Sequence, residues 1–180
     1  MEFTDLLLVG IEISVAFAGF AGIIATFQYR GEKQAKRGDV IGIAMIVHIS
    51  LACGILSGLP LLLSTFNIEA ETIWTVCSLF CAIYILYIMQ SVNRNIQGAV
   101  KKLSTRLLFG SFTAGGSCIV LALFVNAADL VFHREPGPYI IAISYGLSLV
   151  GYMFTRLLLH PLWVTVKEQE TANLSGTNTA

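Results

Sequence analysis

The chain has 180 residues, of which 56% are hydrophobic and only 12% are charged. Soluble domains carry about 25% charged residues, so this composition excludes an ordinary soluble domain and indicates a membrane protein. The formal net charge is zero, and without a basic face the chain lacks the electric field that attracts nucleic acid, so no nucleic-acid partner is expected.

Five stretches are long and apolar enough to be membrane spans, since a spanning helix needs about 20 mainly apolar residues. In chain order they are 5–28, 39–64, 72–92, 106–128 and 138–160. They lack the alternation of barrel strands, so they predict an all-α polytopic transmembrane helix bundle, a single domain over residues 1–166. The polar tail 167–180 has no apolar period, and we expect it to be disordered.

The basic residues predict the orientation of the spans, because lysine and arginine beside a span are retained in the cytoplasm. All but one of the eleven Lys and Arg residues lie in the first connection, in the third connection or towards the C-terminus, and the exception is Arg134 in the fourth connection. We therefore expect the N-terminus outside and the C-terminus in the cytoplasm.

Small side chains spaced four residues apart recur in three of the predicted spans. They are Ser14, Ala18 and Gly22 in the first, Ser50, Gly54 and Gly58 in the second, and Ser111 and Gly115 in the fourth. Small residues let helix backbones approach closely, so these positions are predicted to pack against other helices, within one monomer or between subunits. A bulky stripe on the first span is predicted to face lipid or a second subunit; it comprises Ile13, Phe17, Phe20 and Ile24.

Glu12 is the most informative single residue, because a carboxylate in an apolar span is costly and normally faces a cavity, a partner or the bundle interior. Two interpretations stay open. The carboxylate lines a functional pathway, or it lies one or two turns below the outer surface and reaches water or caps a neighbouring helix.

His48, about two turns into the second span, is a further pathway candidate. A structural histidine, hydrogen-bonded to a hydroxyl or a carbonyl, is the favoured interpretation. Counting ~1.5 Å per residue from opposite membrane surfaces separates His48 from Glu12 by about 12 Å, so direct contact is not expected. Haem bound by His48 and His160 is a weaker alternative.

The outer connection before the fifth span contains a compact charged group that either receives a ligand or partner or is a solvated turn. Its members are Asp129, His133, Arg134 and Glu135.

The four cysteines all lie in hydrophobic runs and are interpreted as buried thiols. Cys77 and Cys81 are four residues apart, but zinc requires about four ligands, so no metal site is predicted. Signatures such as GxSxG, HExxH and the phosphate-binding glycine loop are missing, so we predict neither an enzyme nor a cofactor.

The run Val15–Ile23, Val-Ala-Phe-Ala-Gly-Phe-Ala-Gly-Ile, followed by the connection around Arg30, resembles the opening of small uncharacterised bacterial integral membrane proteins. The resemblance covers the first span and the general multi-span layout. It implies a bacterial inner membrane and carries no established activity.

These features predict a non-catalytic membrane protein that acts by helix–helix association, as a homo-oligomer or as a subunit of a larger membrane complex. One alternative is an ion or proton channel, or a small transporter, with Glu12 and His48 along the pathway. A second is a haem- or quinone-linked electron-transfer subunit.

Overall fold

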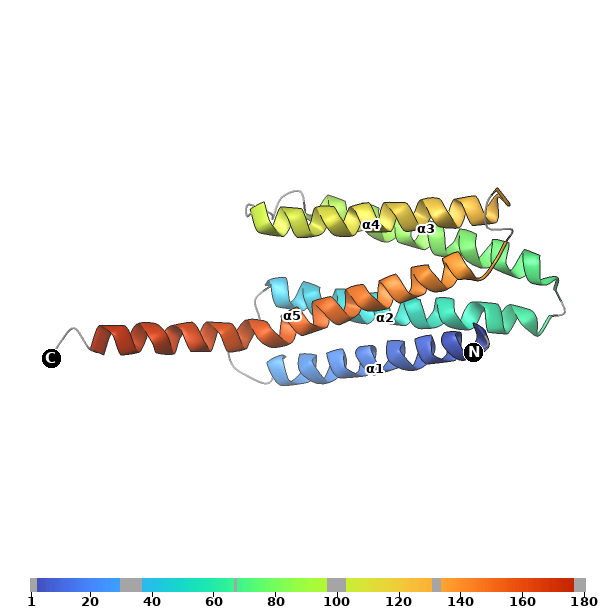
Figure 1. Cartoon of the computed structure of the whole chain (residues 1–180). Helices are drawn as coiled ribbons and strands as arrows, with labels where there is room; N and C mark the ends of the chain where they lie inside the picture. Colours follow the sequence, from blue (N-terminus) through green and yellow to red (C-terminus); the bar gives the residue numbers. More distant parts are fainter. Residues whose placement is uncertain (1–2, 30–36, 67, 97–102, 131–133, 177–180) are drawn as a thin grey trace. The chain divides into compact units, whose positions relative to one another are not determined.

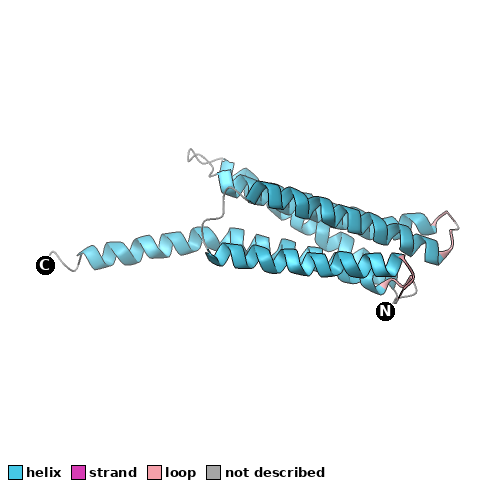
Figure 2. Cartoon of the chain, turned by 90° about the horizontal axis from the view of Figure 1, so that it is seen from above, coloured by secondary structure: helices cyan, strands magenta, loops and turns pink. Residues whose placement is uncertain are grey.

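A computed structural model describes residues 3–29, 37–66, 68–96, 103–130 and 134–176. Within these ranges the chain is all-α (Figures 1 and 2). The helices are α1 (Phe3–Tyr29), α2 (Arg37–Ser64), α3 (Ala70–Ile96), α4 (Leu103–Ala127) and α5 (Gly137–Gly176). The predicted helical class is therefore confirmed.

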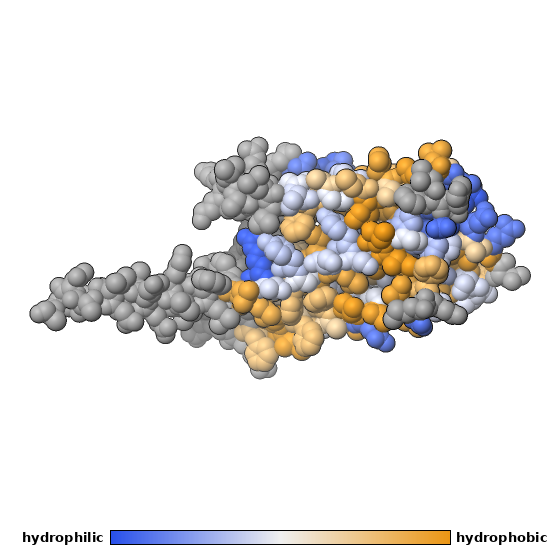
Figure 3. Space-filling model, viewed as in Figure 1, coloured by the Kyte–Doolittle hydropathy of each residue, from blue (hydrophilic) through white to orange (hydrophobic). Residues whose placement is uncertain are grey.

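Each of the five helices contains a segment long and apolar enough to cross a membrane. The segments are Phe3–Phe27, Gly42–Ser64, Ala70–Arg94, Gly110–Ala127 and Gly137–Leu159. Large apolar side chains such as Phe27, Ile55 and Leu121 are mostly exposed, and orange, hydrophobic residues reach the surface in Figure 3. A soluble protein rarely exposes so much apolar surface, whereas lipid covers it without cost. By the composition of its helices, this is a multi-pass membrane protein.

The last helix extends beyond the predicted span, which ends at residue 160. α5 continues to Gly176, so the disorder expected after Val166 is not found over 167–176; residues 177–180 lie outside the described ranges. The segment after Val166 contains the good helix formers lysine, glutamate, glutamine and alanine, and no glycine or proline interrupts it before Gly176. Disorder was expected because the tail after Val166 is polar and has no apolar side that could pack against the rest of the protein.

The helices group into two compact units. The first contains all of α3 and α4 with the adjoining parts of the other helices, Met1–Ile11 and Ile55–Tyr145. The second contains the remaining parts of α1, α2 and α5, within Glu12–Gly54 and Gly146–Ala180.

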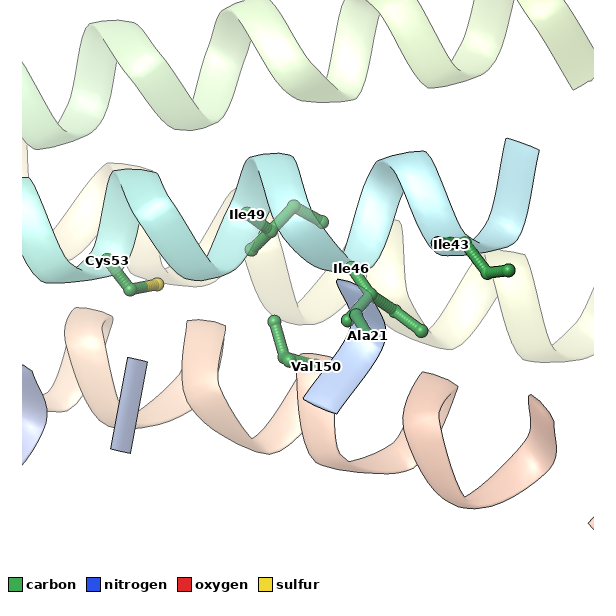
Figure 4. Close-up of a cluster of buried hydrophobic side chains, with 6 residues drawn as sticks. All are labelled: Ala21, Ile43, Ile46, Ile49, Cys53 and Val150. Carbon is green, nitrogen blue, oxygen red and sulfur yellow. The ribbon is translucent and has the colours of Figure 1, made fainter. Parts of the chain in front are cut away.

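The second unit has an apolar core to which α1, α2 and α5 all contribute (Figure 4). Its buried members are Ala21, Ile43, Ile46, Ile49, Cys53 and Val150. Gly146 brings α5 close to α2, because a methyl group there would lie 2.7 Å from Cys53 Sγ. Lipid is as apolar as this core, so close van der Waals contact rather than the hydrophobic effect holds these helices together.

The bulky stripe predicted on α1 is divided between two environments. Phe17 and Ile24 pack against the core of the second unit, and the Phe17 ring lies 5.7 Å from that of Phe154 in a tilted arrangement that aromatic pairs favour. Ile13 and Phe20 are exposed. The expectation that the whole stripe faces outward was therefore wrong, because positions 17 and 24 lie on the same side of the helix as buried Ser14 and Ala21.

The first unit contains a helical proline with a specific compensation. Pro60 lies inside α2, and because proline has no N–H, the carbonyl of Leu56 loses its usual donor four residues on. The hydroxyl of Tyr139 in α5 donates to this carbonyl. Tyr139 is fully buried and packs against the ring of Trp74 in α3, with centroids 6.0 Å apart. Pro60 therefore does not end α2. The hydrogen bond from Tyr139, which replaces the one that Pro60 removes, joins α2 to α5.

Tyr139→Phe removes this hydrogen bond with little change in side-chain volume. We expect it to reduce the free energy of unfolding by about 0.6–1.7 kcal/mol, the range of interhelical hydrogen bonds in membranes. In a Pro60→Ala background the backbone N–H of residue 60 donates to the carbonyl of Leu56. Tyr139→Phe should therefore reduce the free energy of unfolding by less in that background. Unfolding in mixed detergent micelles measures both costs, and equal costs in the two backgrounds would contradict this account.

Candidate functional site

Helix α1 has a buried side and an exposed side at helical spacing. The buried side includes Leu7, Ser14 and Ala21. In the second unit the opposite side is open to the surroundings, and we call it the exposed α1 face: Glu12, Val15, Ala16, Gly19, Gly22 and Ile23. An α-helical period of 3.6 residues separates the two sets cleanly.

Glu12 lies near the middle of the span on this exposed face. It is nine residues after Phe3, where the candidate span begins, which places it about 13.5 Å along the helix axis. Within the described part of the chain, the structure gives its carboxyl no hydrogen bond or ion pair. An acidic side chain at mid-span costs about 2.5–3.5 kcal/mol, so this position requires a compensating partner or environment.

Two glycines on the exposed α1 face, Gly19 and Gly22, have open space around them. Among the described residues, a methyl group added at either one would meet nothing within 4 Å. Gly22 was predicted to pack against another helix, and among the described residues no such neighbour contacts it. Glycines that leave open space on a membrane helix allow a second backbone to approach closely.

The other predicted packing positions of α1 and α2 are used inside the chain. Ser14 and Ser50 are buried, and a methyl group at Gly54 would lie 3.2 Å from Ser14 Cβ. At Gly58 the nearest atom lies at 3.8 Å, on Ile11. Ala18 is half-buried. For these positions the structure supports packing within one monomer.

In α4 the two predicted positions differ. Gly115 is contacted by Tyr145 of α5, since a methyl group there would lie 2.7 Å from the tyrosine hydroxyl, and that hydroxyl donates to the carbonyl of Phe112 at 2.9 Å. Ser111 is exposed instead. Gly115 thus lets α4 and α5 approach.

His48 is exposed on α2 and takes part in an interaction within the chain. Ser50 and Ser57 on the same helix are buried, whereas His48 is exposed. Among the described residues, His48 forms no hydrogen bond or ion pair with Glu12. The side chain of His160, the second residue in the haem hypothesis, lies outside the described side chains. The two pathway candidates therefore share exposure, and no hydrogen bond or ion pair of the Glu12 carboxyl is found among the described residues.

The span of α5 carries hydroxyl side chains on its exposed side, which sequence reasoning missed. Ser148, Tyr152 and Thr155 are exposed and follow each other at helical spacing; we call them the hydroxyl face of α5. Thr155 Oγ1 donates to the carbonyl of Gly151 at 2.9 Å. Pale residues of intermediate hydropathy lie along α5 in Figure 3. The signal was present in the sequence as hydroxyls three to four residues apart in an otherwise apolar span.

A buried asparagine is a second feature that the sequence did not single out. Asn126 of α4 is fully buried, and its Nδ2 donates to Ser78 Oγ at 3.2 Å and to the carbonyl of Glu135 at 3.1 Å. A backbone carbonyl only accepts, so the amide orientation follows from the contact with Glu135. Asn126 therefore joins α3, α4 and the connection before α5.

The predicted outer charged group lies partly within the described residues. Arg134 pairs with Glu71 at 3.3 Å, with both side chains partly in solvent, and such a pair adds about 0–1 kcal/mol. Asp129 and Glu135 are exposed, and both Asp129 and Arg134 have a backbone φ of 57°. His133 lies outside the described residues. A binding site and a solvated turn both stay predictions for this group.

An open groove of about 720 Å³ lies along α3 and α4 in the first unit. Its lining residues are Ile83, Leu86, Tyr87, Met89, Gln90, Asn93 and Thr113. None of the residues singled out from the sequence contributes to it.

The cysteines follow the prediction with one exception. Cys53, Cys77 and Cys81 are buried thiols, whereas Cys118 is exposed on α4. Among the described residues, no three His, Cys, Asp or Glu side chains are grouped so that they hold a metal ion. The exception arises because an apolar run in a membrane helix has a lipid-facing side as well as a buried one.

Comparison with protein families, with curated proteins and with solved structures finds no match to this chain. The five candidate spans agree with the multi-span layout, and no family is identified.

Asn126→Leu removes both hydrogen bonds of the buried amide and leaves the carbonyl of Glu135 without a donor. We expect a loss of about 1–3 kcal/mol in the free energy of unfolding, the cost of leaving a buried polar group unpaired. Asn93→Leu, at an exposed amide on α3, is the matched control and should change stability little. A cost at Asn126 no larger than at Asn93 would contradict a structural role for Asn126.

Proposed function

We propose that this protein is a non-catalytic membrane protein that works by association, with the exposed α1 face as its interface to another membrane subunit. The assembly is a homo-oligomer or a larger complex in a bacterial inner membrane. The observation that carries the proposal is the exposed Glu12 near mid-span on the same helix face as Gly19 and Gly22, which have no neighbours within the described residues.

Lipid chains do not satisfy this surface. Hydrocarbon offers the Glu12 carboxyl neither a hydrogen-bond donor nor an acceptor, so lipid leaves the cost of burying it uncompensated. A neighbouring helix provides both polar atoms and close backbone contact over the two glycines. Ser14 packs against Gly54 of α2 from the buried side of α1. The exposed α1 face is therefore not used by this contact and is available to another subunit.

The orientation proposed for the chain has the N-terminus outside and the C-terminus in the cytoplasm. It rests on the distribution of basic residues, which favours the cytoplasm for the first and third connections. Arg94 at the end of α3 belongs to the proposed cytoplasmic side, and the pair of Arg134 with Glu71 to the opposite side.

The second candidate function is an ion or proton pathway that passes Glu12. It is favoured by the position of a carboxylate near mid-span. Because Glu12 and His48 are both exposed, such a pathway would run between subunits. This candidate therefore also requires association.

Gly19→Leu and Gly22→Leu place bulky side chains on the exposed α1 face. The structure has open space at both positions, so the monomer should remain folded while close approach of a partner helix is blocked. Gly110→Leu is the matched control, because Gly110 on α4 is also without neighbours. We expect the particle mass in mild detergent to fall for the α1 variants only; unchanged masses in both would refute the proposed interface.

Reporter fusions test the orientation. Fusions at Lys36 and at Lys101 should report the cytoplasm, and a fusion at Glu69 should report the outside, because basic connections are retained inside. Opposite locations for Lys36 and Lys101 would exclude five spans with this orientation.

A further inference from the structure

We propose that the partner of the exposed α1 face is a second copy of this chain, and that the hydroxyl face of its α5 receives Glu12. This inference rests on the proposed function. The predicted contact joins the Glu12 carboxyl of one copy to Ser148 of its neighbour. Both side chains are exposed polar groups within candidate membrane spans, and the Glu12 carboxyl is costly against lipid.

Depth in the bilayer supports this pairing. The spans Phe3–Phe27 and Gly137–Leu159 are the first and the fifth, so both run in the same direction across the membrane. At ~1.5 Å per residue, Glu12 is about 13.5 Å into its span and Ser148 about 16.5 Å into its own. The offset of about 3 Å is within reach of a glutamate side chain, which has three rotatable bonds.

The two groups also match in hydrogen-bonding chemistry. A serine hydroxyl that donates within its own helix keeps lone pairs that accept. A carboxyl that holds its proton carries an O–H that donates to such an oxygen. This contact therefore requires no cationic residue at the depth of Glu12, where the described spans of this chain contain none.

Side-chain size agrees with the same register. Tyr152 lies about 22.5 Å into the fifth span, and Ala16 and Gly19 lie about 19.5 and 24 Å into the first. The exposed tyrosine ring of one copy is thus opposite the small residues of the other, where a methyl group at Gly19 would meet nothing within 4 Å. Large against small is the arrangement that close helix packing needs.

The contact joins two different faces, so each copy carries one of each. Such heterologous contacts produce closed rings when the rotation between copies closes. A symmetric contact of α1 with α1 would instead place Glu12 against Glu12 and leave the hydroxyl face of α5 in lipid.

Cross-linking between two tagged copies tests the pairing while leaving Glu12 and Ser148 intact. One copy carries Gly19→Cys and the other Thr155→Cys, about 24 and 27 Å into their spans, both in a Cys118→Ala background that removes the exposed native thiol. We expect a disulfide dimer under mild oxidation only when the two copies are mixed. Each variant alone is the control.

Glu12→Gln and Glu12→Leu then test the hydrogen bond itself. Glutamine keeps an N–H donor, so the cross-link yield should be retained, whereas leucine should weaken association by about 3- to 18-fold, the worth of one interhelical hydrogen bond in lipid. Equal yields for the leucine and glutamine variants would overturn the role of Glu12.

The remaining outcomes separate this inference from the proposed function. Self-cross-linking of the Gly19→Cys copy alone would establish a symmetric α1 contact, which overturns the pairing and leaves association intact. A particle above monomer mass with no cross-link would also overturn the pairing alone. A monomeric mass for the unsubstituted protein would overturn both.

Discussion

Hydrocarbon supplies no hydrogen bonds, and this constraint explains the placement of Tyr139 and of the Asn126 amide nitrogen. Pro60 removes one backbone donor, and Tyr139 replaces it from a different helix. Asn126 is buried where a hydroxyl and a carbonyl accept from its amide. In water such bonds contribute modestly, but in lipid the alternative is an unpaired group, so they define which helices are neighbours in the first unit.

Glu12 is the conspicuous departure from this rule. Its carboxyl lies on an exposed face, whereas Ser14, Ser78 and Asn126 are buried within the chain. A group that is not satisfied within the chain points to something outside it. Gly19 and Gly22 on the same helix face agree with this interpretation, because they leave space for the backbone of a second helix.

Small residues have two uses in this protein, and the difference lies in what surrounds them. Gly54, Gly115 and Gly146 are each contacted by a side chain of another helix, which makes them structural. Gly19 and Gly22 also lie in apolar spans among other small residues, but among the described residues they have no neighbour on another helix. A motif of small residues predicts that another helix approaches closely. It does not predict whether that helix belongs to the same chain.

The number of spans and their membrane character were determined by the sequence alone, because length and apolar content are enough to define a span; the end of α5 at Gly176 was not. Residue type and spacing also singled out Glu12 and indicated that Ser14, Gly54 and Gly115 pack against other helices. Only the tertiary structure decided which side of each helix is buried, since the five spans are mainly apolar and lipid tolerates an apolar surface on either side. For the same reason Phe17, Asn126, Tyr139 and the hydroxyl face of α5 acquired their roles only once the neighbouring helices were in place.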